Sequence, residues 1–163
     1  MDEIALVKET TQYIKIKMGD EMYGIDIKYI DNIVRMQHIT RVPKVPTYIK
    51  GVINLRGEVI PVFSLRLKMG MEEVEETKKF RIIIIKLDGS YVGLIVDEVR
   101  EVITLQNDLT EKVYRDPSDP TQNFLLGVGK DGDNLISLLD LNEVVAERIN
   151  GGVKLCPELI WII

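Results

Sequence analysis

Several residue types on which enzymes and secreted proteins depend are scarce in this sequence. Its 163 residues include one histidine, one cysteine and one tryptophan. One cysteine cannot form an intrachain disulfide, and one histidine leaves a zinc ion without its usual imidazole and thiolate ligands. The N-terminal sequence MDEIALVKETT is unlike a signal peptide, and no apolar stretch approaches the roughly 20 residues of a membrane-spanning helix. The sequence therefore predicts a cytoplasmic protein with no metal and no cofactor.

Positive charge is also limited. The formal net charge is −5, from 21 lysines and arginines against 26 aspartates and glutamates. The basic residues alternate with acids, as in DEVREV, so they form no cluster that could face phosphates. We therefore expect no nucleic-acid partner. Since 45% of the residues are hydrophobic and 29% are charged, the composition is typical of a globular protein that buries a core.

The groups needed for catalysis are few. A nucleophilic triad would need His38 beside Cys156 or a serine, and no local motif brings such residues together. No glycine segment has the G-x-x-x-x-G-K-[ST] spacing of a phosphate-binding loop. Adjacent carboxylates such as Asp97-Glu98 are expected to be solvated, because a general acid/base pair requires a dry cleft. The sequence predicts that the protein is not an enzyme; a catalytic or ligand-binding barrel is the alternative, which a buried polar pocket would favour.

Most local patterns are those of β-strands. Residues 13–18 alternate apolar and polar side chains, as a strand with one buried face does. Residues 81–87 form a run rich in isoleucine, typical of a strand that is buried on both faces. The pairs Gly19-Asp20 and Asp88-Gly89 follow these strands and suit tight hairpin turns. We therefore expect an all-β fold.

The chain also resembles itself at two offsets. A shift of 76 residues aligns Gly51 with Gly127 and Leu65 with Leu141 without gaps in between. A shift of 69 residues aligns Gly24 with Gly93, Ile30 with Val99, and Ile33 with Val102. Two copies are too few for a solenoid. We expect one domain over residues 12–149, with similar halves at about 12–78 and 79–149.

Helix is expected only as short segments. Residues 141–149 have an apolar face, with Asp140 placed to cap the helix and Glu143 three residues further on. Under the shift of 76, Asp140 corresponds to Ser64, which precedes the segment LRLKMG. Each half is therefore expected to end in a strand, a capping residue and a short helix.

Three features suggest contact surfaces. Ile27, Ile30 and Ile33 recur at every third position, and they belong either to the core or to a groove for partner side chains. Arg56 lies between apolar strand residues and a glycine; its planar guanidinium either binds a partner carboxylate or is an exposed turn cation. The apolar tail, residues 150–163, either packs on a barrel flank or is a docking or oligomer contact.

A resemblance to a known family rests on three segments: DEMYGIDIKYIDNIV, VPKVPTYIKGVINLRGEVIPVFSL and VGLIVDEVREVI. Within the second segment, Tyr48 to Val62 fits the pattern (F/Y)-I-x-G-V-x-N-L-R-G-x-(V/I)-(I/L)-P-V. On these residues the chain resembles the CheW family, the coupling proteins of bacterial chemotaxis, from about residue 12 to residue 149.

This resemblance implies two SH3-like five-stranded β-barrel subdomains packed together, with short helices that include a C-terminal one. It also implies a non-enzymatic adaptor that couples the regulatory domain of the histidine kinase CheA to the cytoplasmic tips of methyl-accepting chemoreceptors. Such a protein reaches the membrane only indirectly, through the receptors. The alternative is a CheW-like coupling domain that comes from a receiver-fused adaptor or from the kinase itself; we expect the stand-alone adaptor.

The resemblance further implies positions for these contacts. The receptor groove would be lined by Ile14, Ile27, Ile30, Ile33 and Val99, with Asn32 at its margin. Arg56 would take part in receptor coupling, and Lys50 and Gly51 would lie near the kinase contact. The resemblance implies no role for residues 150–163.

Overall fold

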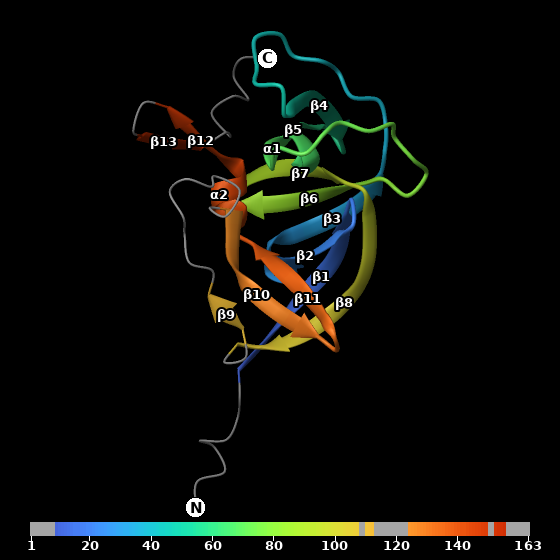
Figure 1. The fold of residues 1–163 in the computed structure, drawn as a ribbon. Coiled ribbons are helices and arrows are strands. Elements are labelled where there is room, and N and C mark those ends of the chain that lie inside the picture. Colours follow the sequence, from blue (N-terminus) through green and yellow to red (C-terminus); the bar gives the residue numbers. More distant parts are fainter. Residues whose placement is uncertain (1–8, 108–109, 113–123, 150–151, 156–163) are drawn as a thin grey trace, which may run out of the picture.

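β-Strands account for most of the chain in the computed structural model (Figure 1). The structure describes residues 9–107, 110–112, 124–149 and 152–155. The strands of the first half are β1 (Thr10–Met18), β2 (Glu21–Asp26), β3 (Ile30–Arg35), β4 (Ile49–Leu55) and β5 (Glu58–Ser64). They are followed by β6 (Arg81–Leu87), β7 (Ser90–Val96), β8 (Glu98–Gln106), β9 (Glu111–Lys112), β10 (Leu125–Asp131), β11 (Asn134–Leu139), β12 (Ala146–Ile149) and β13 (Gly152–Leu155). The expected all-β fold is confirmed.

Two sheets form the body of the molecule. One has the strand order β8-β1-β2-β11-β10-β9 and the other has the order β3-β6-β7-β5-β4, while β12 and β13 pair as a separate hairpin. We call the first sheet subdomain A and the second subdomain B. Apart from the two-residue strand β9, each subdomain contains five strands. This agrees with the expected pair of SH3-like subdomains.

The subdomains divide the chain differently from the expected halves 12–78 and 79–149. The hairpin β1–β2 comes from the first half, yet it pairs with β8 and β11. The hairpin β6–β7 comes from the second half, yet it pairs with β3 and β5. Subdomain B is therefore continuous in sequence, and it is inserted between the two parts of subdomain A.

The strand pairing confirms both internal alignments. Val62 in β5 pairs in parallel with Gly93 in β7, and Leu138 in β11 pairs in parallel with Gly24 in β2. Val62 and Leu138 are related by the shift of 76, and Gly24 and Gly93 by the shift of 69. A register slip of one residue would turn every side chain to the opposite face. The shared register therefore shows that the two shifts relate equivalent strands.

Both subdomains close at a glycine. An added Cβ at Gly51 would lie 2.1 Å from the carbonyl oxygen of Thr40, and at Gly127 it would lie 2.5 Å from the carbonyl oxygen of Glu111. Thr40 bridges to β4, and Glu111 in β9 pairs with β10, so the chain crosses β4 and β10 at the same place. Only a residue without a side chain permits this approach. The closure of subdomain B thus accounts for Gly51 without any partner.

A large apolar cluster, here called the shared core, joins the subdomains. Its members include Ile16, Met18, Tyr23 and Ile25 from β1–β2, and Ile83, Ile85, Val92 and Leu94 from β6–β7. Smaller clusters fill the subdomain interiors, with Ile53, Ile60, Ile82 and Ile84 in B, and Tyr13, Ile103, Ile136 and Leu138 in A. Each of the two hairpins therefore buries one face in its own subdomain and the other in the shared core. This explains the isoleucine run of residues 81–87.

The described helical elements are η2 (Ile27–Tyr29), α1 (Leu65–Lys68) and α2 (Leu141–Val145). The predicted caps are confirmed, because Ser64 accepts a hydrogen bond from the Leu67 amide at 3.3 Å and Asp140 accepts one from the Glu143 amide at 3.4 Å. The helix expected over 141–149 is wrong in length. It ends at Val145, and the following residues form β12, whose backbone groups pair with β13. Residues 156–163 of the tail lie outside the described residues.

Candidate functional site

Four residues predicted to line a receptor groove meet at the edge of the shared core. Ile14, Ile30, Ile33 and Val99 are each partly buried and pack against that cluster. Ile30 and Ile33 belong to β3 of subdomain B, whereas Ile14 and Val99 belong to β1 and β8 of subdomain A. The structure thus brings together apolar side chains from both subdomains. We call these four the border residues.

The strand ends shape this border. β3 and β8 are outer strands of their sheets, and each pairing contains a bulge, at Ile30–Asn32 and at Ile14–Ile16. A bulge changes the direction of the side chains beside it. Asn32 accepts a hydrogen bond from the backbone amide of Ile33 at 2.8 Å, which holds its side chain beside the apolar surface. This agrees with the predicted position of Asn32 at the margin.

Ile27 lies in η2, directly before β3, and is partly buried. Asp26 caps this turn by accepting a hydrogen bond from the Lys28 amide at 3.0 Å. The Lys28 ammonium lies 4.9 Å from the centre of the Tyr29 ring, and Tyr29 itself packs against the shared core. Sequence reasoning missed Tyr29 and Lys28, although they fall between Ile27 and Ile30 in the three-residue repeat. The border therefore combines apolar side chains with a tyrosine and an exposed cation.

Part of the border is apolar surface that the described residues leave uncovered. Val102 in β8 pairs with Ile14 in β1 and remains 52% exposed. Its neighbours Arg100 and Glu101 are also exposed. An exposed valine beside a half-buried isoleucine provides a contact for apolar side chains of a partner, and the flanking charges keep the surface hydrated when no partner is bound.

Arg56 belongs to another part of the surface. It is the first residue of the two-residue turn between β4 and β5, where φ is 53° at Arg56 and 82° at Gly57. Positive φ at both positions is typical of a type I′ hairpin turn. Asn54 accepts a hydrogen bond from the Gly57 amide at 3.2 Å, while Leu55 packs in the interior of subdomain B. The turn therefore fixes the backbone of Arg56 and leaves its side chain exposed, outside the border residues.

The two predicted kinase contacts lie together in β4, but they differ in what they offer a partner. The Lys50 ammonium pairs with the carboxylate of Glu73, which lies in the segment between α1 and β6, and a third of the Lys50 side chain is exposed. Gly51 is buried where Thr40 crosses β4. Only Lys50 therefore presents a side chain at this position.

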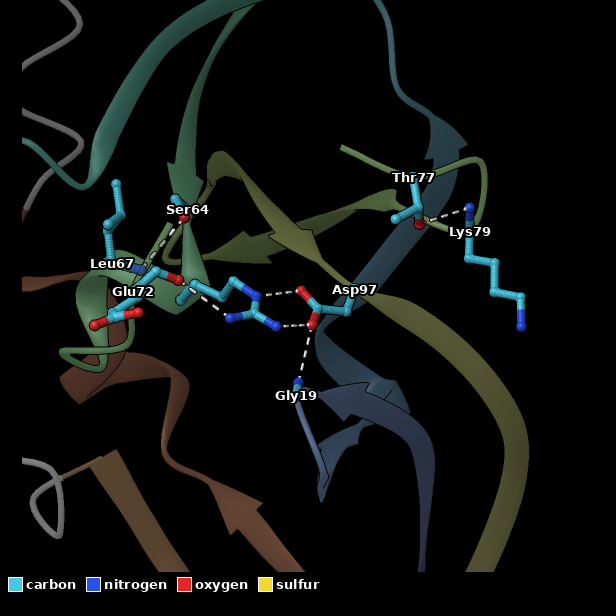
Figure 2. A network of polar contacts seen from close by, with 8 residues as sticks. Gly19, Ser64, Leu67, Glu72, Thr77, Lys79 and Asp97 are labelled. Carbon is cyan, nitrogen blue, oxygen red and sulfur yellow. Dashed lines mark hydrogen bonds and ion pairs between the residues drawn. The ribbon is translucent and has the colours of Figure 1, made fainter. Parts of the chain in front are cut away.

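A polar joint connects the subdomains (Figure 2). Asp97 lies between β7 of subdomain B and β8 of subdomain A. It accepts two hydrogen bonds from the Arg66 guanidinium, at 2.7 and 2.5 Å, and a third from the Gly19 amide at 2.9 Å. Arg66 also donates to the carbonyl of Glu72 at 3.1 Å. One carboxylate thus links α1, the β1–β2 turn and the crossover between the sheets.

Sequence reasoning missed this joint, because it expected Asp97 to be solvated. That expectation is wrong: both the Asp97 and the Arg66 side chains are only 15% exposed. Hydrogen bonds to Asp97 raise the pKa of Arg66, so the arginine stays charged. The available signal was an aspartate directly after a buried strand, where a bidentate arginine partner compensates its desolvation.

The described residues provide contact surfaces rather than reacting groups. Within them, no three histidine, cysteine, aspartate or glutamate side chains are placed to hold a metal ion. Ser64 is their one buried polar residue, and its hydroxyl caps α1. No helix in this part of the chain is long and apolar enough to cross a membrane. Fold and surface together define an all-β interaction protein of two fused subdomains.

Comparison with known proteins agrees with this class. The chain belongs to the CheW-like domain family, whose family model matches residues 12–148. It is 36% identical over 138 residues to the Chemotaxis protein CheW of Helicobacter pylori, which covers 85% of this chain and 83% of that protein. It is also 36% identical over 141 residues to the Chemotaxis protein CheW of Bacillus subtilis, with coverage of 86% and 90%.

A solved structure shows the same fold. The crystal structure of the scaffolding protein TtCheW from Thermoanaerobacter tengcongensis superposes with a TM-score of 0.79 at 31% sequence identity, covering 90% of this chain and 94% of that one. The family resemblance found in the sequence is therefore confirmed.

Proposed function

We propose that this protein is a non-enzymatic chemotaxis scaffold that couples the histidine kinase CheA to the cytoplasmic tips of methyl-accepting chemoreceptors. The observation that carries the proposal is the family match over residues 12–148. The names of its relatives, Chemotaxis protein CheW and a scaffolding protein, support it. The protein works by proximity in the cytoplasm, and it meets the membrane only through the receptors.

The receptor side of this proposal rests on the border residues. A receptor tip is a helical hairpin, and helices bind to apolar grooves through side chains spaced along one face. Ile14, Ile27, Ile30, Ile33 and Val99 would accept these side chains, with Asn32 at the margin. Support comes from the partial burial of all these residues and from the exposed Val102 beside Ile14. Arg56 would contribute a guanidinium from a separate turn of the same scaffold.

The kinase side rests on β4. Lys50 would contact the regulatory domain of CheA, and Gly51 would hold the chain crossing that places Lys50 at the surface. The pairing of Lys50 with Glu73 shows that this ammonium is already placed for a carboxylate. A kinase acid could exchange with Glu73, since an exposed ion pair contributes little to stability, with a median of about 0–1 kcal/mol.

A reconstitution tests the proposal. Purified protein is mixed with the kinase regulatory domain, with a receptor cytoplasmic fragment, and with both, and the complexes are separated by size. We expect binding to each partner alone, a ternary complex with both, and kinase activation in receptor-containing membranes only when the protein is added. Binding to neither partner would contradict the proposal. So would hydrolysis of ATP by the isolated protein at a rate that a point substitution changes.

A further inference from the structure

A pocket in subdomain B has mainly apolar walls. It lies between the β3–β4 connection, the segment that leads from α1 to β6, and α1 itself, and we call it the linker pocket. Apolar side chains on its walls include Ile39, Val42, Val45, Pro46, Val74 and Phe80. Val74 is 45% exposed, so part of the apolar wall faces solvent. An accessible apolar pocket of this kind suits an apolar segment of chain.

The charged residues around the linker pocket are not evenly matched. Lys50 pairs with Glu73, and Arg66 pairs with Asp97. Two further cations, Arg41 and Lys44, line the same pocket and are exposed, while Glu76 is the one further acid. After the two pairs are set aside, cations exceed acids by one. An occupant with an acidic side chain among apolar ones therefore fits the pocket better than a basic one.

The C-terminal residues 156–163 have this composition. Their sequence, CPELIWII, consists of apolar side chains and a proline around a single acid, Glu158. A contiguous apolar segment of this kind is normally covered by protein. Among the six residues after Glu158 and before it, none is basic. The segment therefore matches the pocket in both hydrophobicity and charge.

The start of this segment lies beside the pocket wall. Leu155, the last residue of β13, pairs with Ala146 in β12. The carbonyl of Ala146 accepts a hydrogen bond from the Lys68 ammonium at 2.9 Å. Lys68 directly follows Leu67, which lines the pocket. The eight residues of 156–163 span up to roughly 26 Å when extended, at about 3.3 Å per residue, which exceeds the width of one such wall.

We propose that residues 156–163 dock in the linker pocket of the same chain, with the apolar side chains against Val42 and Val74 and with Glu158 near Arg41 and Lys44. The tail then acts as an intramolecular cover for this part of subdomain B. Lys50 lines the same pocket, so a docked tail and the kinase regulatory domain would compete for it. That consequence, unlike the docking itself, rests on the proposed function.

The single tryptophan makes the docking measurable. Trp161 lies inside the segment, and the chain contains no other tryptophan. We expect blue-shifted emission and weak quenching by acrylamide in the full chain. Val42→Asp and Val74→Asp, which put a charge into the pocket wall, should shift the emission to the red and raise the quenching constant several-fold. Leu135→Asp is the matched control, because Leu135 is 63% exposed in subdomain A and does not line the pocket.

The alternatives give different results. If Val42→Asp and Val74→Asp leave quenching unchanged, the tail docks elsewhere or nowhere, and the proposal is wrong. If quenching falls as the protein concentration rises, the tail enters a second copy, which also overturns the intramolecular proposal. A cooperative thermal transition equal to that of Leu135→Asp shows that the variants remain folded. Since no kinase is present, these outcomes do not depend on the proposed function.

A cross-link supplies an independent test. Cys156 is the only cysteine, so Val74→Cys creates one defined pair for a short bis-maleimide reagent. We expect a cross-linked monomer, identified by mass spectrometry, at high yield with Val74→Cys and at background yield with Leu135→Cys. Equal yields from the two variants would contradict docking in the linker pocket. Competition is tested separately: removing residues 156–163 should tighten binding of the kinase regulatory domain, and an unchanged affinity would leave docking intact but refute the competition.

Discussion

Ile30 and Val99 occupy equivalent positions in the two subdomains. Ile30 pairs with Ile85, Val99 pairs with Ile16, and both Ile30 and Val99 pack against the shared core. The shift of 69 residues that relates Ile30 to Val99 also relates Ile16 to Ile85. The border is therefore built from the same position of a repeated unit, used once in each subdomain. A partner that contacts both residues senses how the subdomains are placed relative to each other.

Truncation of Ile30 should weaken receptor binding more than folding. We expect Ile30→Ala to reduce affinity for a receptor cytoplasmic fragment by roughly 1–3 kcal/mol, because an apolar anchor is lost at the contact. Binding of the kinase regulatory domain should be unchanged, since Lys50 lies on β4 and Ile30 on β3. Isothermal titration with each partner measures both effects.

The matched control for this prediction is Ile85→Ala. Ile85 lies opposite Ile30 and is fully buried, so its truncation should cost roughly 2–5 kcal/mol of folding free energy. Ile30→Ala should cost clearly less in the same urea titration. An equal loss of stability would mean that Ile30 serves the core and not a binding surface.

Arg56 should act through its guanidinium and not only through its charge. The type I′ turn fixes its backbone, so a planar group with five donors projects in a defined direction. We expect Arg56→Lys to impair kinase activation in receptor-containing membranes nearly as much as Arg56→Ala. Both variants should keep their stability within about 0.5 kcal/mol, as exposed turn substitutions usually do. Full activity of the lysine variant would show that charge alone is needed.

The joint between Arg66 and Asp97 should contribute to stability as a coupled pair. Arg66→Leu leaves the Asp97 carboxylate largely buried with the Gly19 amide as its remaining donor, and we expect a loss of roughly 3 kcal/mol. Asp97→Asn together with Arg66→Leu should lose less than the sum of the single variants. Chemical denaturation of all four proteins gives the coupling energy. Additive losses would mean that the pair does not connect the subdomains energetically.

The charge cluster at Lys15 should make stability depend on pH at both extremes. The Lys15 ammonium lies 2.6 Å from a Glu101 oxygen and 3.1 Å from an Asp131 oxygen. The hydrogen bond from Lys15 lowers the pKa of Glu101 from its ordinary 4.5, and hydrogen bonds to Glu101 and Asp131 raise the pKa of Lys15 from its ordinary 10.5. Stabilisation by Glu101 is therefore complete above about pH 4.5 and is lost as the pH falls through the lowered pKa. Stabilisation by Lys15 is complete below about pH 10.5 and is lost as the pH rises through the raised pKa.

Urea titrations over a pH series test this prediction. Glu101→Gln should lower stability at neutral pH and flatten its decline in acid. In a Lys15→Met background, Glu101→Gln should change neither quantity, because the partner that perturbs the carboxylate is gone. If the acid decline of Lys15→Met still depends on Glu101, another group is responsible for the lowered pKa.

The sequence by itself determined the local structure and the family. Alternation at residues 13–18, the capping residues Ser64 and Asp140, and the two internal shifts all depend on neighbours close in the chain or on matching segments. Strand type, helix starts and equivalent positions therefore follow from the pattern. The border residues could be named in advance because a family motif marks their positions, and the structure then placed four of them against one cluster.

Only the tertiary structure decided which segments meet. The hairpin β1–β2 matches β6–β7 in pattern, so the pattern cannot say that each pairs with strands of the other half. Asp97 and Arg66 are 31 residues apart, and Gly51 requires glycine because Thr40 crosses it. The end of α2 at Val145 depends on pairing between β12 and β13. Contacts of this kind reflect the path of the whole chain and the closure of its sheets, which local periodicity does not encode.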